Sequence, residues 1–403
     1  MYKHQNFFFI GLFALLGSIL ISDLLFISYS SYFSFLTLIY VIGYLVIVFN
    51  NFYLNFKSIL YIFVILKSYI FVVALFDFSM ADRYMHFLHG DAYTYHIPAA
   101  LKIGSLNDAV AHLFSLTFNF NGRLTHVFLS FAYHVMPSYS NDIFYNIALN
   151  GYLLNFLFNI FTLIIVYKTI IFYFSNISLA RKIVIFIAFN PFFLYYSSMP
   201  QKEALLFFAL SMLVYFLVTN RYKYLFLSSM IFLFERIYML LLTTLLIFFL
   251  SKINRYHKII ILVIGFVVVE RFLGIERALS MHAAYIANMK ATTKSFLPFD
   301  NIIGDILRIF FSPFILRPFL TSGIGDNIFY SAYYLTLPLY IYFMIKSLFS
   351  YKYYNKIILI SLIFVWFVSP SHSVLKLTIL TFFAILLVAN LKINFFEDKK
   401  YVK

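Results

Sequence analysis

Cysteine is absent from this 403-residue sequence, and glycine (12 residues) and proline (9 residues) are scarce. Without cysteine the chain has neither a disulfide framework nor a thiol nucleophile. Charged residues make up only 11% of the chain, against 63% hydrophobic residues. Soluble proteins carry roughly 25% charged residues. The composition therefore argues against an ordinary soluble enzyme and indicates a membrane protein.

Several catalytic and binding motifs are also missing. The sequence contains no HExxH, no CxxC, no Walker loop and no GxSxG. Its ten histidines show no spacing typical of a metal-ligand set, so we expect neither a metal nor a cofactor. The net charge of +15 is common in nucleic-acid-binding proteins. Here, however, the basic residues lie in short clusters between apolar runs, where membrane orientation explains them, so we expect no nucleic-acid partner.

Long apolar runs recur along the whole chain, and each is long enough to cross a bilayer or nearly so. This pattern predicts an all-α, polytopic membrane helical bundle of about 11–12 transmembrane helices, forming one integral-membrane domain over residues 1–403. The first run is too long for a cleaved leader and is expected to stay as an anchor. The expected spans are Phe7–Ile27, Tyr32–Phe49, Ser58–Phe76, Tyr145–Phe172, Ile183–Ser198, Glu203–Val218, Lys223–Leu250, Ile259–Phe272, Ile328–Ile345, Ile357–Val368 and Val374–Leu391.

The basic clusters predict which side of the membrane each connection faces. With the clusters placed inside, both termini are cytoplasmic, and residues 77–141 and 273–327 form two long segments on the outer side. This topology requires Arg123–Met136 and Leu307–Leu320 to be interfacial or re-entrant helices. Twelve of the fifteen acidic residues lie between Asp77 and Asp326, in or beside these outer segments. Acidic residues hardly influence orientation, so their position favours chemistry at the outer face.

One apolar stretch, Lys223–Leu250, carries Glu235 and Arg236 near its middle. A single tilted span would bury this charged pair in lipid, which is costly. We therefore expect a helical hairpin that brings the pair to the outer surface. Arg236 then has two interpretations: a partner for Glu235 at the hairpin tip, or a clamp for a phosphate group, whose oxygens match the planar guanidinium.

The stretch HGDAYTYHIPAALKIG, from His89 to Gly104, is unusually polar for this chain. Asp91 and His96 are candidates for the base that accepts a proton from a substrate hydroxyl. Tyr93 and Tyr95 are candidates for sugar binding. The alternative is a solvated loop in which Asp91 only caps a short helix.

Further candidate substrate-binding residues lie at the outer ends of spans or in the outer segments. Lys202 and Glu203 open a span after a tight turn, where Glu203 also suits the positive end of a helix. Arginines in an amphipathic segment contact phosphates or merely extend toward the interface. The remaining candidates are Arg277, His282, Arg308, Arg317 and His372.

The stretch GDAYTYHIPAALKIG, followed by GRLTHVFLSFAYHV and NPFFLYYSSMPQKEALLFF, is similar in order to the outer loop and following helices of integral-membrane glycosyltransferases of the GT-C class. Within that group, the Phe/Tyr/Ile-rich composition and the long second outer loop resemble Wzy-type polymerases of O-antigen and oligosaccharide repeat units. This resemblance implies a bacterial inner-membrane enzyme that polymerises undecaprenyl-pyrophosphate-linked repeat units on the periplasmic face. It also implies membrane lipids, a chain-length regulator and a flippase as partners.

The sequence departs from the GT-C pattern in two respects. The acidic residue follows the third expected span instead of the first, and Asp91 is followed by Ala92 instead of a second acidic residue. Both departures favour a metal-free reaction assisted by arginine. Two alternatives stay open: a GT-C transferase that adds a single sugar from a polyprenyl-phosphate donor, and a flippase or transporter of lipid-linked oligosaccharides.

Overall fold

The computed structural model describes residues 55–65, 67, 95–115, 122–136, 138, 143–188, 193, 200–250, 253–272, 274, 280, 283–284 and 287. The chain divides into two compact units, which are considered separately. One unit comprises residues 60–175 and 194–278. The other comprises residues 1–59, 176–193 and 279–403.

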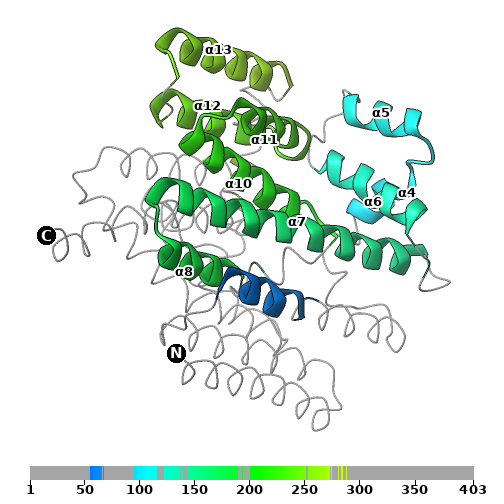
Figure 1. Cartoon of the computed structure of the whole chain (residues 1–403). Coiled ribbons are helices and arrows are strands. Elements are labelled where there is room, and N and C mark those ends of the chain that lie inside the picture. The colour runs from blue at the N-terminus through cyan, green and yellow to red at the C-terminus, as the bar shows by residue number, and fades with distance from the viewer. Residues whose placement is uncertain are drawn as a thin grey trace, which may run out of the picture. The chain divides into compact units, whose positions relative to one another are not determined.

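All regular structure among the described residues is helical, as the sequence predicts (Figure 1). One described helix is long and apolar enough to cross a membrane, over Asn146–Tyr173. Two shorter apolar helices are Phe56–Ile65 and Glu203–Thr219. The helices of the larger described unit are α4 (Ile97–Leu101), α5 (Leu106–Phe114), α6 (Arg123–Val135), α7 (Ile143–Phe174), α10 (Glu203–Thr219), α11 (Tyr222–Glu235), α12 (Tyr238–Leu250) and α13 (Arg255–Phe272).

Helix α7 is the longest of these, with 32 residues, and it confirms that the stretch predicted as a span over Tyr145–Phe172 is helical. At 1.5 Å per residue it is about 48 Å long. Figure 1 shows it running beside α10, with α4 and α6 against its N-terminal part. Its buried face carries polar side chains that a lipid-facing surface would not tolerate. These are Asn146, Asn150, Asn155, Asn159, Thr162 and Thr169.

Helices α10 and α11 pack against each other as a hairpin. Asn220 ends α10 in the left-handed conformation (φ 55°) and donates its backbone N–H to the carbonyl oxygen of Phe216. Asparagine tolerates this conformation better than most residues, so the chain reverses within two residues. The hairpin brings the start of α10 and the end of α11 to one end of the pair, and Arg221 and Lys223 to the other.

Helix α11 ends at Glu235 and α12 begins at Tyr238, so the stretch Lys223–Leu250 forms two helices, as predicted. The side of the membrane that this break faces stays a prediction, but the charged pair is not exposed to solvent. Both Glu235 and Arg236 are buried within the protein, because α6 packs against α11 there. Helix α12 continues from the break and packs against α13.

The described residues between 95 and 136 form three short helices, α4, α5 and α6. Pro98 lies in the first turn of α4, where its missing N–H costs nothing, so the helix restarts there as expected. Helix α4 ends at Leu101, before Gly104, which lies in the connection to α5. Ser105 then caps α5, its hydroxyl accepting from the backbone N–H of Asp108 and donating to that residue's carboxylate.

Helix α6 is about 20 Å long, which is shorter than the hydrocarbon core of a bilayer. This length is compatible with the interfacial or re-entrant helix that the topology requires, and the position of α6 relative to a membrane stays a prediction. Helix α6 packs against α4, α5, α7 and α11, so His126 is buried while His134 is exposed. Protein neighbours therefore cover the face on which His126 lies.

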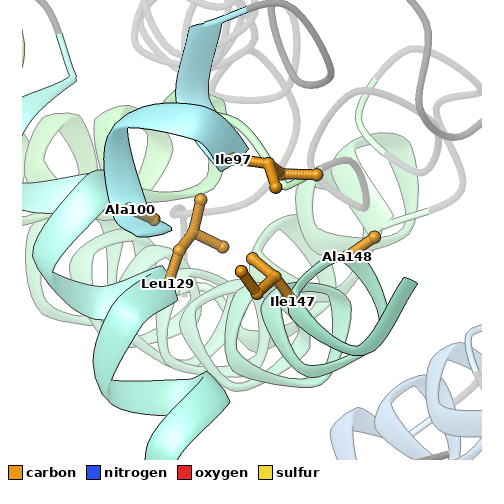
Figure 2. Packing of buried hydrophobic residues seen from close by; sticks show 5 residues of the cluster. All are labelled: Ile97, Ala100, Leu129, Ile147 and Ala148. Atoms are coloured by element: carbon orange, nitrogen blue, oxygen red, sulfur yellow. The ribbon is translucent and has the colours of Figure 1, made fainter. Parts of the chain in front are cut away.

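A small apolar core holds α4, α6 and α7 together (Figure 2). Ile97 and Ala100 of α4 and Leu129 of α6 pack against Ile147 and Ala148 of α7. Next to this core, Gly151 permits a close approach, because a Cβ there would lie 2.4 Å from the side chain of Leu129 and 3.1 Å from Pro200. The core therefore fixes the residues directly before Ile97 and those one turn before Leu129.

In the other unit, α8 (Ile177–Ala188) begins six residues before the predicted start at Ile183. Asn176 explains the difference, because its side-chain oxygen accepts the backbone N–H of Leu179 and caps the helix. Arg181 and Lys182, expected in a connection, are therefore helical. The other predicted spans before residue 55 and after residue 287, and the segment Leu307–Leu320, lie outside the described residues.

Candidate functional site

A buried group of polar side chains lies where α4, α6, α10 and α11 meet, next to the apolar core. We call it the polar cluster. Its members are almost wholly inaccessible to solvent: His96 (0% exposed), His126 (1%), Lys202 (1%), Glu203 (5%), Glu235 (0%), Arg236 (3%), Thr125 (3%) and Arg123 (2%). So many buried ionisable groups are rare unless they serve a purpose, because burial of each costs free energy.

Three histidines form a hydrogen-bonded chain along one edge of the polar cluster. His96 Nδ1 lies 2.9 Å from His126 Nε2, and His126 Nδ1 lies 2.8 Å from His112 Nε2. His96 precedes α4, His126 is in α6 and His112 is in the last turn of α5. The Tyr95 ring packs edge-on against both His96 and His126, which fixes the ring planes.

Gly122 makes room for this chain. Its φ of +80° suits glycine, and a Cβ there would lie 2.5 Å from His96 Cε1 and 2.9 Å from His96 Nδ1. Any other residue would therefore displace the His96 ring. The backbone N–H of Gly122 also donates to the carbonyl oxygen of Glu235, 3.2 Å away, which ties the start of α6 to the end of α11.

Glu235 completes the N-terminus of α6 from a different helix. Gly122, at the cap position, has no side chain to accept the free N–H groups of the first turn. The Glu235 carboxylate accepts both the backbone N–H of Thr125 and, at 3.1 Å, its hydroxyl. A carboxylate at this position satisfies an otherwise unpaired donor and complements the positive end of the helix dipole.

The environment of the histidines keeps them neutral. Burial lowers the pKa of His96 well below its usual value, and the charges of Lys202, His126 and Arg236 lower it further. Burial likewise lowers the pKa of His126 to about 3, assisted by His112, Lys202 and Arg123. The pKa of His112 is lowered mainly by partial burial and then by Arg123. A neutral imidazole has a free lone pair, so it can act as a base.

Cations surround the histidines on several sides. Arg123 donates from Nη1 to the backbone oxygen of Leu113 at 2.9 Å, which holds its guanidinium beside the end of α5. Lys202 stands at the start of α10, and Arg236 at the break after α11. Lys202 and Glu203 also interact electrostatically with Glu235. The site thus holds two guanidinium groups and an ammonium near the carboxyl groups of Glu203 and Glu235.

The buried atoms of the polar cluster that have no hydrogen-bond partner among the described residues include His96 Nε2 and Glu203 Oε2. An unsatisfied buried polar atom costs about 1–3 kcal/mol. Such atoms in a native protein commonly mark a place where a ligand supplies the missing contact. The free Nε2 belongs to the neutral imidazole at the end of the histidine chain, which places an available base among three cations.

Five of the residues predicted from the sequence lie in or against the polar cluster: Tyr95, His96, Lys202, Glu203 and Arg236. They come from three places in the sequence, at residues 95–96, 202–203 and 236, and the fold brings them together. Seven further predicted residues lie outside the described residues, so their relation to the site stays a prediction. These are Asp91, Tyr93, Arg277, His282, Arg308, Arg317 and His372.

Sequence reasoning missed His112 and Thr125 and assigned His126 to the wrong environment. Neither the spacing from His96 to His112 nor that from His112 to His126 corresponds to a recognised motif. The one available signal was the polarity of GRLTHVFLSFAYHV, where Arg123, Thr125 and His126 gather in the first turn of an apolar helix. A buried face would have explained that clustering as well as an interface does.

Among the described residues, no three His, Asp or Glu side chains converge in the manner of a metal site. The three histidines form a line instead of enclosing a point. Comparisons of the chain with protein-family models, curated proteins and solved structures find no match.

Proposed function

We propose that this protein is a membrane glycosyltransferase that acts on lipid-linked sugars, and specifically that it polymerises oligosaccharide repeat units carried on undecaprenyl pyrophosphate. The observation that carries the proposal is the polar cluster itself. It combines three buried cations with a neutral histidine whose Nε2 has no hydrogen-bond partner among the described residues. Phosphate binding and proton removal, the two tasks of this reaction, require those two kinds of group.

The cations account for recognition and departure of the pyrophosphate. Guanidinium groups bind phosphate oxygens through pairs of parallel hydrogen bonds, and an ammonium adds a point charge. Arg236, with Lys202 and Arg123 nearby, would hold the donor's pyrophosphate and stabilise the negative charge that develops as it leaves. Stabilisation of developing charge by fixed groups is usually the largest contribution to catalysis. In this reading no metal ion is needed.

His96 accounts for activation of the acceptor. In the proposed step, the acceptor hydroxyl oxygen forms a bond to the anomeric carbon of the donor, and the carbon–oxygen bond to pyrophosphate breaks. The hydroxyl proton passes to His96 Nε2, and the electron pair of the broken bond leaves with the pyrophosphate. A positioned general base typically contributes about 10²–10⁴-fold to the rate. Asp91 was the other candidate base, and this assignment gives its role to His96.

The distribution of apolar side chains supports a membrane setting. Soluble proteins rarely bury several charged groups or expose many large aliphatic side chains, and the described residues show both features. Helix α13 alone has six exposed large apolar residues: Ile259, Ile260, Val263, Ile264, Phe266 and Val267. Exposed apolar residues of this kind suit contact with lipid chains.

The α10–α11 hairpin supports the location of the site at the outer side. Arg221 and Lys223 are exposed at one end of the hairpin, and the polar cluster lies at the other end. Because basic residues in short loops favour the cytoplasmic side, the polar cluster would face the periplasm of a bacterial inner membrane. Helix α10, with 17 residues, is about 26 Å long, close to the thickness of the hydrocarbon core.

The proposal is tested in a strain that lacks the chromosomal gene and receives plasmid-borne variants. Loss of the protein should leave surface glycans with a single repeat unit, and the wild-type gene should restore long chains. Arg236→Ala should behave like the empty plasmid, because the departing pyrophosphate loses its principal cation. Arg221→Ala, at the other end of the hairpin, is the matched control and should restore long chains.

Other outcomes distinguish the alternatives. Long chains in the deletion strain would contradict the proposed function. Loss of one sugar from every glycan, at unchanged length, would indicate the single-sugar transferase. If the protein is a flippase, its loss would leave the lipid-linked unit on the cytoplasmic side of the membrane. Purified protein in vesicles would then not elongate the unit extracted from the deletion strain. Elongation of that extracted unit by wild-type protein alone would support the polymerase.

A further inference from the structure

We propose that His96, His126 and His112 form a proton relay that connects the reacting acceptor hydroxyl with solvent. The inference rests on the proposed function and deepens it, because it assigns a route to the proton that His96 removes. The proposal stands on two short nitrogen–nitrogen distances, 2.9 Å and 2.8 Å, that link the three rings in series.

The two ends of the chain differ in the way that a relay requires. His96 is wholly buried, and its Nε2 has no hydrogen-bond partner in the part of the chain that the structure describes. His112 is only partly buried, since it lies in the last turn of α5 beside exposed residues of that helix. A proton accepted at the inner end therefore has one described path outward, through His126 and then His112.

The hydrogen bonds allow two arrangements of protons when all three rings are neutral. In the first, every ring carries its proton on Nδ1, so His96 donates to His126 and His126 donates to His112. In the second, every ring carries its proton on Nε2, and both bonds run in the reverse direction. Only the first arrangement leaves a lone pair on His96 Nε2 to accept a proton.

A proton that enters at His96 Nε2 and another that leaves from His112 Nδ1 convert the first arrangement into the second. His96 passes its Nδ1 proton to His126, which passes its own Nδ1 proton to His112, which releases one to water. No ring gains a lasting charge and no co-reactant is needed. When the pyrophosphate departs, a solvent proton that travels back through His112 and His126 would release the proton on His96 Nε2 to a phosphate oxygen and restore the first arrangement.

The surroundings favour transfer over storage of charge. Lys202 and Arg236 face His96, and Lys202 and Arg123 face His126. The Glu235 carboxylate accepts from Thr125, the residue before His126, instead of from the imidazoles. The Tyr95 ring packs edge-on against His96 and His126. A cation that stays on either ring would be repelled, so the proton must move on to His112.

The test uses full-length protein in lipid vesicles and the lipid-linked repeat unit extracted from the deletion strain. His112→Gln is the informative variant, because the glutamine side-chain oxygen can still accept the Nδ1–H of His126 but cannot pass a proton on. A relay predicts a transfer rate at least tenfold below wild type for both His112→Gln and His112→Ala, with little change in KM. It also predicts a larger solvent deuterium isotope effect in both variants.

Added imidazole should restore part of the rate of His112→Ala, because the position is partly exposed and a free base can replace the ring. The matched control is His134→Ala, an exposed histidine at the end of the same helix as His126, which should transfer at the wild-type rate. Wild-type rates for His112→Gln would overturn the relay. So would a loss in His112→Ala that imidazole does not reverse and that leaves the isotope effect unchanged.

A separate measurement distinguishes failure of the relay from failure of the proposed function. If wild-type protein does not elongate the extracted unit, the glycosyltransferase proposal fails, and nitrogen-15 spectra of labelled histidines still test the chain. The relay requires His96, His126 and His112 to share one neutral tautomer at pH 7. A spectrum in which one of the three carries the opposite tautomer, or is protonated, contradicts the relay whatever the activity.

Discussion

The two ends of the α10–α11 hairpin carry similar residues in different environments. At one end, Arg221 and Lys223 flank the turn after Asn220 and are exposed. At the other end, the start of α10 and the break after α11 also interrupt apolar sequence with charge, yet all four residues there are buried: Lys202, Glu203, Glu235 and Arg236. A hydropathy profile alone does not distinguish these two interruptions.

The difference lies in what covers each end. Helix α6 packs against the end of α11, and its first turn is bonded to Glu235, so the charges there are enclosed by protein. Arg221 and Lys223, in contrast, remain exposed. The two charged breaks of this hairpin therefore differ in whether another segment of the chain covers them. Substitutions at the two ends should differ accordingly.

The largest effect is expected at Gly122, directly before α6, the helix that covers the buried end of the hairpin. In Gly122→Ala, the new Cβ overlaps the buried His96 ring, and alanine must adopt a positive φ. Strain and overpacking together should lower the free energy of unfolding by about 3 kcal/mol. The measurement is equilibrium unfolding in mixed detergent micelles. Gly104→Ala is the control, because its Cβ would meet only Asp108 at an ordinary 3.7 Å; equal effects of the two would contradict the close approach.

The next effect is expected at Glu235. In Glu235→Ala, the Thr125 N–H is left buried without its acceptor, which should cost about 2 kcal/mol in the free energy of unfolding. Glu235→Gln keeps an oxygen that can accept this bond, so it should retain most of the stability. The same unfolding measurement applies. If glutamine were as damaging as alanine, the role of the carboxylate as a cap for α6 would be wrong.

A smaller effect should appear as a pH dependence. The pKa of His126 is about 3 in the folded protein and 6.5 in the unfolded chain, so the unfolded chain binds more protons between these values. The stability contributed by neutral His126 is therefore present above pH 6.5 and is lost as the pH falls toward 3. When the pH falls from 7 to 5.5, the free energy of unfolding of wild type should decrease by about 1 kcal/mol more than that of His126→Gln. Parallel curves for the two proteins would show that His126 titrates normally.

The smallest effect is expected at the exposed end. Arg221→Ala should leave both unfolding and glycan length unchanged, because an exposed charge at a turn contributes little. Glycan length on gels and unfolding in micelles measure this together. A loss of long chains in this variant would remove the contrast between the two ends, and with it the argument that enclosure by α6 marks the functional end.

Part of the fold and of the site could be predicted from the sequence. The uninterrupted apolar run over Tyr145–Phe172 predicted α7 within two residues at each end, because length and hydropathy are local properties. Glu235 and Arg236 predicted the helix break because two charged residues interrupt an apolar stretch, which is also a local property. His96, Lys202 and Arg236 stood out because ionisable residues are rare in this chain. Their convergence followed from the hairpin and from the core of α4, α6 and α7.

Other features could not be predicted because they depend on contacts between distant segments. The capping of α6 by Glu235 joins residues 110 positions apart, and the His96–His126 bond joins residues 30 apart. The burial of one face of α6 against other helices could not be predicted for this reason. Its alternation of polar and apolar residues is compatible both with a membrane surface and with a protein interior that holds polar groups.

By itself, the sequence determined that this chain is helical, largely apolar and poor in charge, since these properties follow from residue type and from period along the chain. The tertiary structure alone decided which of the few charged residues are enclosed, which histidines share hydrogen bonds, and which helix lacks its own cap. The physical reason is that burial and hydrogen bonding are properties of neighbours in space. The packing of α6 against α11 is what provides those neighbours here.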